Sequence, residues 1–352
     1  MNESMPIALP SLVDRGGPAQ PLLIVDRLRK HFAVRGSKAV VRAVDEVSFT
    51  VAKGETLGIV GESGCGKSTT ARLIARLMPA DAGEMVFDGD GVGQFGGMAL
   101  KDYRRNLQMV FQDSLASLNP RLTALDAIAY GPQVHGLSKA AALSRAAELL
   151  VRVGLAPNQF GSRYPHELSG GQRQRVNIAR ALAFEPRLLI LDEAVAALDK
   201  SVQAQVLNLL QALKTERGLT YLFISHDLHV VHYLADRVLV MYLGLVVEVG
   251  PVERLYAQPR HPYTRALLSA VPSMDPARRT ERSPLSGDPP NPINPPSGCR
   301  FRDRCAHAHA ACAAAAPVLR ETTPGHWAAC HLDDPSSGHP EAPARAAMAF
   351  AA

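Results

Sequence analysis

The chain has 352 residues, 47% of them hydrophobic, and a formal net charge of +5 with a pI of about 9.0. This length suggests about two domains, and the positive charge is compatible with a solvated surface, with nucleic acid or with an anionic membrane face. The N-terminus lacks a basic start followed by an apolar run, and no stretch approaches about 18 uninterrupted apolar residues, so we expect neither a secretory signal nor a membrane span. We expect a protein of the cytoplasm, where a disulfide framework is not expected.

Composition divides the chain into a main domain and smaller segments around it. Strand-like and helical patterns alternate from Leu22 to Tyr256, and Pro-rich sequence such as "GDPPNPINPPSG" (287–298) follows. We therefore predict a mobile tail over 1–21, a main domain over 22–256 with a helical subdomain at about 105–180, a small C-terminal domain over 257–334 and a disordered tail over 335–352.

Three short apolar runs predict strands of the main domain. The runs "TLGIV" (56–60), "LLIL" (188–191) and "YLFIS" (221–225) are typical of strands buried on both faces, and each leads into a turn and a helical pattern. Residues 136–155 have helical periodicity without a strand signal. The prediction is an α/β fold in which helices cover a parallel sheet.

A phosphate-binding loop is predicted where "GESGCGKS" (61–68) fits G-x-x-x-x-G-K-[ST] between a predicted strand and a predicted helix. Its glycines let backbone N–H groups wrap the phosphates, and the helix N-terminus adds its dipole. Lys67 is predicted to reach the β- and γ-phosphates, and Ser68 to hold Mg²⁺. The thiol of Cys65 is either a small tolerated group or one made reactive by a lowered pKa. The expected nucleotide contacts here are Gly61, Glu62, Ser63, Gly64, Cys65, Gly66, Lys67, Ser68 and Thr69.

Two carboxylates end the run "LLILDE" (188–193). Beside a phosphate loop, this pattern predicts an NTPase. Asp192 is predicted to coordinate Mg²⁺, directly or through water, and Glu193 to polarise the attacking water.

The segment "ELSGGQRQRVNIARAL" (167–182) contains LSGGQ, the signature of ABC-transporter ATPases, and the chain resembles this family over about residues 22–255. The resemblance implies a mixed sheet with a helical subdomain, and two ATPase domains that close head to tail around ATP. It implies that four signature residues serve the partner's ATP: Ser169, Gly170, Gly171 and Gln172.

The resemblance also assigns single residues. Phe32 stands at the adenine-stacking position, with plain core packing as its alternative; Gln112 in "VFQD" matches the Q-loop, and Asp199 in "AALD" matches the D-loop. His226 in "ISHD" matches the switch histidine that contacts the γ-phosphate. The implied catalytic residues are Glu193, His226 and Gln112, and the implied Mg²⁺ residues are Ser68, Gln112 and Asp192.

Two residues depart from the family pattern. Ala194 stands where the family usually has Pro, and Ala196 where it usually has Ser. The carboxylates are intact, so the departures bear on the coupling of the two ATP sites and leave room for an asymmetric pair.

The stretches "HPYTRALLSAVP" (261–272) and "FQDSLASLNPR" (111–121) resemble the oligopeptide/dipeptide branch of ABC importers, and the match continues to about residue 332. The resemblance implies an ATPase on the cytoplasmic face of the membrane that powers peptide import, with nickel or glutathione as the cargo of relatives. The implied partners are a paralogous ATPase subunit, two transmembrane permeases and an extracytoplasmic binding protein, and no nucleic acid.

Four of the five cysteines gather near the C-terminus, at Cys299, Cys305, Cys312 and Cys330. Their spacing resembles a pattern of the same branch that binds a [4Fe–4S] cluster. Four thiolates suit zinc as well, nearby histidines keep a Cys/His zinc site open, and the thiols could also be unligated. We expect a structural role, in a domain distant from the phosphate loop. The arginines that could offset the charge of a cluster are Arg300, Arg302 and Arg304.

Two other classes of function are weighed against the importer. A soluble ABC ATPase acting on DNA or ribosomes would suit the basic pI, but the stretch between Lys67 and Ser169 has room for a helical subdomain and little more. An exporter would often carry fused membrane helices, and the motif at 261–272 favours import.

Overall fold

A computed structural model describes residues 20–93, 96–270 and 290–343. Of the mobile tail expected over 1–21, residues 1–19 lie outside this part of the chain. Residues 287–289 of the Pro-rich stretch and residues 344–352 of the tail expected over 335–352 lie outside it as well. Residues 335–343 of that tail are described. His339 there is buried, and its Nε2 lies 2.8 Å from the carbonyl oxygen of His307.

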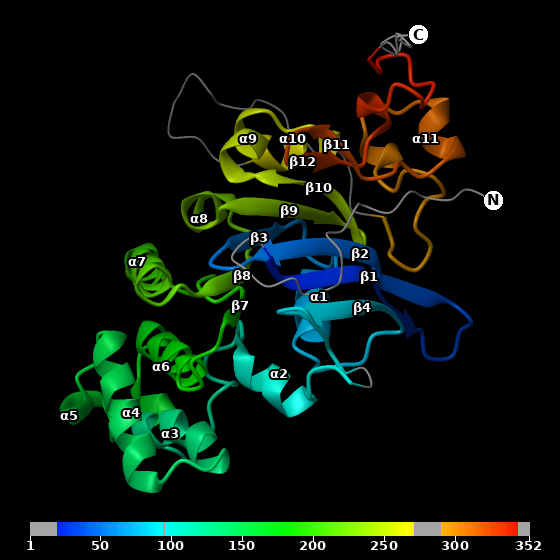
Figure 1. The fold of residues 1–352 in the computed structure, drawn as a ribbon. Helices are drawn as coiled ribbons and strands as arrows, with labels where there is room; N and C mark the ends of the chain where they lie inside the picture. The colour runs from blue at the N-terminus through cyan, green and yellow to red at the C-terminus, as the bar shows by residue number, and fades with distance from the viewer. Residues whose placement is uncertain (1–19, 94–95, 271–289, 344–352) are drawn as a thin grey trace, which may run out of the picture.

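The described strands form two sheets (Figure 1). The strands are β1 Pro21–Ala33, β2 Val40–Ala52, β3 Thr56–Val60, β4 Ala82–Phe87, β5 Asp90–Gly91, β6 Leu107–Val110, β7 Leu188–Asp192, β8 Thr220–Ile224, β9 Arg237–Tyr242, β10 Leu245–Pro251, β11 Arg320–Thr323 and β12 His326–Ala328. The smaller sheet has the order β2-β1-β4-β5, and the larger has the order β11-β12-β10-β9-β3-β8-β7-β6.

Helices surround the larger sheet (Figure 1). The described α-helices are α1 Lys67–Ile74, α2 Leu100–Asn106, α3 Ala124–Val134, α4 Lys139–Arg152, α5 Pro157–Phe160, α6 Gly170–Leu182, α7 Lys200–Arg217, α8 Leu228–Leu234, α9 Val252–Ala257, α10 Pro262–Ser269 and α11 Ala310–Ala314. Short 3₁₀ turns are η1 Pro165–Glu167, η3 Arg302–Arg304 and η4 His331–Asp333. None of the described helices is long and apolar enough to cross a bilayer.

The three predicted strands are β3, β7 and β8, and every residue in them is buried. They pair in parallel at the centre of the larger sheet, with β9 on one side and β6 on the other. Beyond β9, the strands β10, β12 and β11 continue the sheet with antiparallel pairing. The larger sheet is therefore mixed, as the family resemblance implied.

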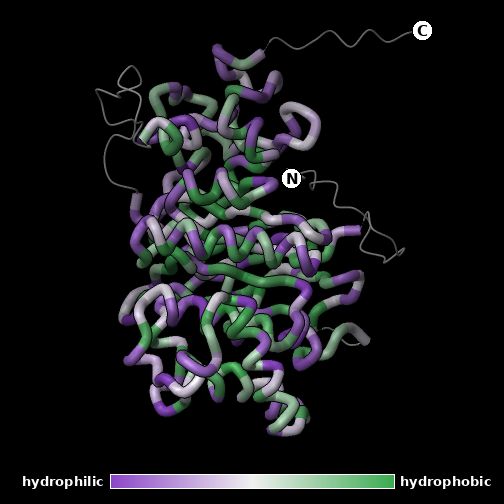
Figure 2. The backbone as a smooth tube through the Cα atoms, turned by 90° about the vertical axis from the view of Figure 1, so that its left-hand side faces the viewer, coloured by the Kyte–Doolittle hydropathy of each residue, from purple (hydrophilic) through white to green (hydrophobic). Residues whose placement is uncertain are grey.

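Successive residues of the central strands serve two hydrophobic clusters, because strand side chains alternate between faces. Leu188 and Ile190 pack with the smaller sheet and α1, whereas Leu189 and Leu191 pack with α3, α4, α6 and α7. Figure 2 shows the hydrophobic segments concentrated in the layers through the middle of the molecule. The two layers hold β3 and β7 rigidly, and these strands carry the candidate site.

The helices α3, α4 and α6 pack against one another in a group beside the sheet (Figure 1). The hydroxyl of Thr123 caps α3 by accepting from the N–H of Asp126, and Ser138 caps α4 in the same way. The helix predicted within 136–155 is α4. Strand β6, which falls within the range of about 105–180 predicted for the helical subdomain, pairs with β7 inside the sheet.

The C-terminal segment is joined to the main sheet. Strand β12 pairs with β10, with Glu248 opposite Ala328 and Val249 opposite Trp327. Figure 1 shows α11 lying beside β11 and β12, at one end of the larger sheet. The Cys-rich segment is thus in contact with the ATPase core, contrary to the expected separation.

Candidate functional site

Four neighbouring strands bring the predicted site residues to one edge of the sheet. In the order β3-β8-β7-β6, the phosphate loop follows β3, His226 follows β8, Asp192 ends β7 and Gln112 follows β6. The carboxyl ends of parallel strands share an edge, which is where open α/β sheets bind ligands. Residues that are far apart in the sequence are therefore assembled by strand order alone.

The phosphate loop is closely fitted between β2 and β9. A Cβ on Gly66, whose φ is 110°, would lie 2.2 Å from the carbonyl oxygen of Ala43, and a Cβ on Gly61 would lie 2.2 Å from that of Met241. The ammonium of Lys67 lies inside the loop, 2.7 Å from the carbonyl oxygen of Gly61. Glycines are thus required here by the close approach of backbone, and the lysine is held where phosphate oxygens would be bound.

Cys65 is buried in this loop, and burial raises the pKa of its thiol. This is the opposite of the lowered pKa that a reactive cysteine needs. The structure therefore favours Cys65 as a small packing residue.

Ser68 and Asp192 meet at the base of the loop, where the Ser68 hydroxyl donates to Asp192 Oδ1 at 2.8 Å. Burial raises the pKa of Asp192. A hydroxyl and a carboxylate are the hard oxygen ligands that Mg²⁺ prefers, so this pair fits the predicted ion.

Glu193 lies between the two other predicted catalytic residues. The amide of Gln112 donates to Glu193 Oε2 at 2.7 Å, and His226 Nδ1 lies 3.3 Å from Glu193 Oε1. Glu193 has a φ of 48°, which is uncommon for a residue other than glycine and is found at active sites. Three residues that the sequence could only list separately are thus in direct contact.

Phe32 and the signature residues lie on different elements. Phe32 is on β1, 39% exposed, with the Lys30 ammonium 5.6 Å from its ring centroid, so it is not plain core.

Ser169 caps α6, its hydroxyl accepting from the N–H of Gln172 while the Gln172 side chain accepts from the N–H of Ser169. Gly171 packs on α7, where a Cβ would lie 2.3 Å from Val202. Asp199 caps α7 by accepting from the same valine's N–H.

Contacts from the C-terminal segment to the phosphate loop are the part that sequence reasoning missed. The guanidinium of Arg304 donates to both carboxylate oxygens of Glu62, at 2.7 and 3.0 Å, and the N–H of Glu62 donates to the Tyr263 hydroxyl at 2.8 Å. Arg300 donates to Asp45, and Arg302 to Asp303. Each of the three arginines thus has a carboxylate among its described partners, and the prediction that they offset the charge of a metal cluster stays a prediction.

The four C-terminal cysteines are free thiols that line one small cavity with His307, His331 and His339. Burial raises the pKa of Cys299 to about 11 and that of Cys330 to about 12. Within residues 290–343 and the rest of the described chain, no three His, Cys, Asp or Glu side chains are arranged to hold a metal ion. The donor types fit iron–sulfur or zinc chemistry, but the described geometry does not form a metal centre.

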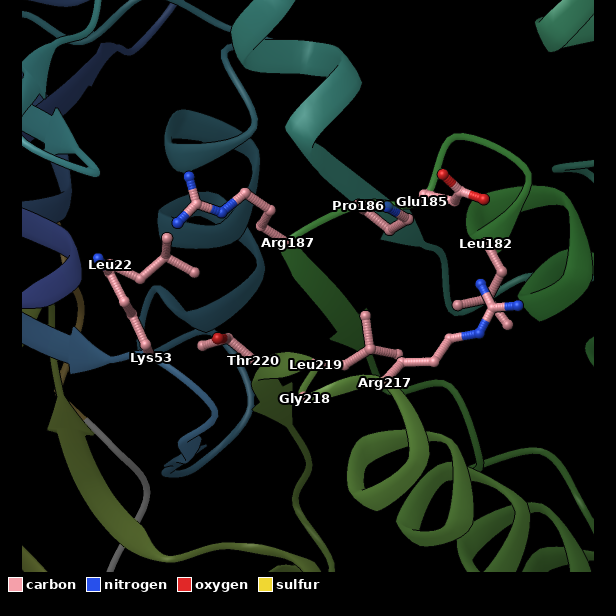
Figure 3. A pocket seen from close by; sticks show the side chains of 10 residues that line it. All are labelled: Leu22, Lys53, Leu182, Glu185, Pro186, Arg187, Arg217, Gly218, Leu219 and Thr220. Atoms are coloured by element: carbon pink, nitrogen blue, oxygen red, sulfur yellow. The ribbon is translucent and has the colours of Figure 1, made fainter. Parts of the chain in front are cut away.

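A separate cavity of about 530 Å³ lies at the opposite end of the strands (Figure 3). Residues 185–187 and 217–220, which lead into β7 and β8, line it together with Leu22 and Lys53. Arg187 and Lys53 on its wall pair with Asp88, so their charges are compensated. The amino ends of parallel strands are not where such sheets place their chemistry, so we do not assign the nucleotide to this cavity.

Two family models match the chain. The model described as ABC transporter matches residues 44–196, and the model described as oligopeptide/dipeptide transporter, C-terminal region, matches residues 247–312.

Similar proteins carry related names. A putative peptide import ATP-binding protein of Brucella ovis is 52% identical over 315 residues, which are 89% of this chain and 98% of the relative. The putative oligopeptide transport ATP-binding protein YkfD of Bacillus subtilis is 49% identical over 316 residues, 89% of this chain and 95% of the relative. The oligopeptide transport ATP-binding protein AppF of the same organism is 48% identical over 322 residues, 89% and 98% of the two chains.

Solved structures share the fold. CbiO1 of Clostridium perfringens, described as part of the ABC transporter complex cbiONQ, has a TM-score of 0.59 and 27% identity and covers 68% of this chain and 91% of its own. A dimeric ATP-binding cassette, MJ0796, was solved in a post-hydrolysis state bound to ADP and phosphate. It has a TM-score of 0.57 and 28% identity, and it covers 65% of this chain and 98% of its own.

Proposed function

The chain belongs to the ATP-binding proteins of the ABC transporter family, and from this premise we propose that it hydrolyses ATP to power peptide import through a membrane permease pair. The observation that carries the proposal is that one chain matches both the ABC transporter model and the oligopeptide/dipeptide C-terminal region. Relatives near half identity that are named for peptide import support the cargo class. The place of action is the cytoplasmic face of the membrane, as a peripheral subunit.

Glu193 is proposed as the general base. Its carboxylate would accept a proton from the water that attacks the γ-phosphate, while the Gln112 amide and His226 hold it in place. Ser68, Asp192 and Gln112 would hold Mg²⁺, and the first two are already in contact. When bound, this ion neutralises charge on the phosphates. Lys67 supplies the remaining positive charge at the loop.

The signature is proposed to act on the ATP of a partner subunit. The first N–H groups of α6, at Gly170 and Gly171, have no acceptor within their own helix and can bind phosphate. Ser169, Gly171 and Gln172 are already held in a capped helix start, so little ordering is needed. The departures at Ala194 and Ala196 support a paralogous ATPase as the partner, with two permeases and an extracytoplasmic binding protein completing the importer.

Adenine recognition is proposed to use Phe32, and Phe32→Ala is expected to weaken ATP binding several-fold. The ring is exposed on β1, and an aromatic stack contributes about 0.5–1.5 kcal/mol beyond area burial. Nucleotide titration of the purified chain measures the change. Tyr130→Ala, on α3 and also exposed, is the matched control. Equal affinity in the Phe32 variant and the wild type would remove Phe32 from the site.

A metal centre at the four C-terminal cysteines is proposed on their convergence around one cavity. Anaerobically purified protein is expected to be brown, to absorb near about 400 nm and to contain about four iron atoms per chain. Cys312→Ser should remove the colour, whereas Cys65→Ser, at the remaining cysteine, should leave it. One zinc per chain would favour the alternative ligand, and four readily alkylated thiols without metal would contradict both.

Uptake in cells tests the function. A strain that lacks this chain should lose growth on defined peptides as sole source of an amino acid, and the wild-type gene should restore it. Uptake of nickel and of glutathione is assayed in parallel. If the strain loses one of these and keeps peptide uptake, the cargo is nickel or glutathione and the proposed peptide cargo is wrong. Affinity purification of this chain should recover membrane permeases. Recovery of nucleic acid in their place would favour the alternative of a soluble ATPase that acts on nucleic acid.

A further inference from the structure

We propose that Arg304, in the Cys-rich segment, is a positioning residue of the nucleotide site that neutralises Glu62 in the phosphate loop and so sets the affinity for ATP. The inference rests on the ATPase function proposed above, and it concerns residues 242 positions apart in the sequence.

Glu62 is an acidic residue in a loop that must accept a polyanion. Its carboxylate receives two hydrogen bonds from Arg304, in the bidentate geometry that matches guanidinium to carboxylate. The side chain of Arg304 is only 5% exposed and that of Glu62 is 22% exposed, so solvent screens the pair weakly. With Arg304 in place, the loop presents the charge of Lys67 to phosphate without a competing free carboxylate.

The backbone of Glu62 is held by Tyr263 on α10 and by Lys67 of the loop itself. Its N–H is bound to the Tyr263 hydroxyl, and its carbonyl oxygen accepts from the Lys67 ammonium at 3.0 Å. A released carboxylate would therefore lie beside this ammonium and would draw it away from phosphate oxygens. The contact with Arg304 keeps this carboxylate paired.

Arg304 is itself held by a built support. Tyr263, Tyr242 and Phe301 form an aromatic cluster with ring centroids 4.6–5.4 Å apart, and Phe301 lies in the same turn as Arg304. Arg304 also lies within 3.5 Å of the Tyr242 hydroxyl. In the same segment, Arg300 donates to Asp45 on β2 and to the Leu243 carbonyl oxygen after β9. The Cys-rich segment thus contacts the loop itself through Arg304, and the neighbouring backbone through Arg300.

Titration of the full-length purified chain with ATP tests the proposal. Arg304→Ala should raise the Kd for ATP by about 10-fold, since an uncompensated charge is left near the phosphates. In the complex assembled with its permeases, KM should rise by the same factor while kcat at saturating ATP changes less than about two-fold. Adding Glu62→Gln to Arg304→Ala should restore most of the affinity, because it removes the unpaired charge. A merely structural arginine would not be rescued in this way.

The controls separate charge from folding. Arg302→Ala removes an arginine from the same turn that contacts Ser297 and Asp303, and it should leave the Kd unchanged. Glu62→Gln alone should tighten ATP binding, because it leaves the charge of Arg304 unpaired near the phosphates. This variant tests the proposal even if Arg304→Ala fails to fold. An unchanged Kd in a folded Arg304→Ala chain, weaker binding in Glu62→Gln or the absence of rescue would overturn the proposal. A wild-type chain that binds no ATP would instead refute the proposed ATPase function.

Discussion

Glu193→Gln is expected to lower ATP turnover by about 10²–10⁴-fold, the usual cost of losing a general base, while ATP binding is retained. The amide keeps the size of the side chain, and its carbonyl oxygen can still accept the hydrogen bond from Gln112. It cannot accept a proton from water. Hydrolysis of ATP by the assembled complex under single-turnover conditions measures the effect.

A matched substitution controls for the chemical change. Glu253→Gln alters an exposed glutamate on α9 and should leave turnover as in the wild type. If the Glu193→Gln complex hydrolyses ATP at nearly the wild-type rate, another group accepts the proton and the assignment is wrong.

Gly66→Ala is expected to weaken ATP binding by at least about 100-fold, because it distorts the phosphate loop. The new Cβ would lie 2.2 Å from the backbone oxygen of Ala43, and a non-glycine residue with this positive φ costs about 1–3 kcal/mol before that overlap is counted. Backbone of β2 cannot move aside as a flexible side chain could. Nucleotide titration and the thermal unfolding midpoint measure the two consequences.

Gly64→Ala in the same loop separates strain from overlap. Gly64 also has a positive φ, at 77°, but a Cβ there would meet no atom within 4 Å. Its loss of affinity should therefore be clearly smaller. Equal losses in the two variants would show that backbone conformation alone, and not the contact with β2, limits the loop.

The sequence predicted the parts of the site that are contiguous. The phosphate loop follows a short, fully buried strand, and Asp192 ends another that Glu193 follows. Such runs are recognised locally. Gln112 and His226 carry no comparable local signal, and only the family resemblance pointed to them. Their contact with Glu193 depends on the strand order β8-β7-β6, which no local pattern encodes.

The smaller sheet escaped local prediction for a different reason. Its strands β1 and β2 pair over their whole length, but register shifts between Val25 and Leu28 and between Leu28 and Lys30 break the alternation of buried and exposed residues. The contact of Arg304 with Glu62 joins residues 242 positions apart, and no local pattern in the sequence indicates it. Charge pairs at such sequence separations are defined by topology.

The pairing of β12 with β10 has a consequence for how the chain folds during synthesis. Glu248 on β10 is fully buried, and its carboxylate lies 2.7 Å from His326 Nε2 on β12, which leaves the ribosome 78 residues later. Until then β10 is an open sheet edge, and a carboxylate destined for the interior has no imidazole partner. We expect the carboxylate of Glu248 to protect this edge from pairing with other chains until β12 emerges and closes it.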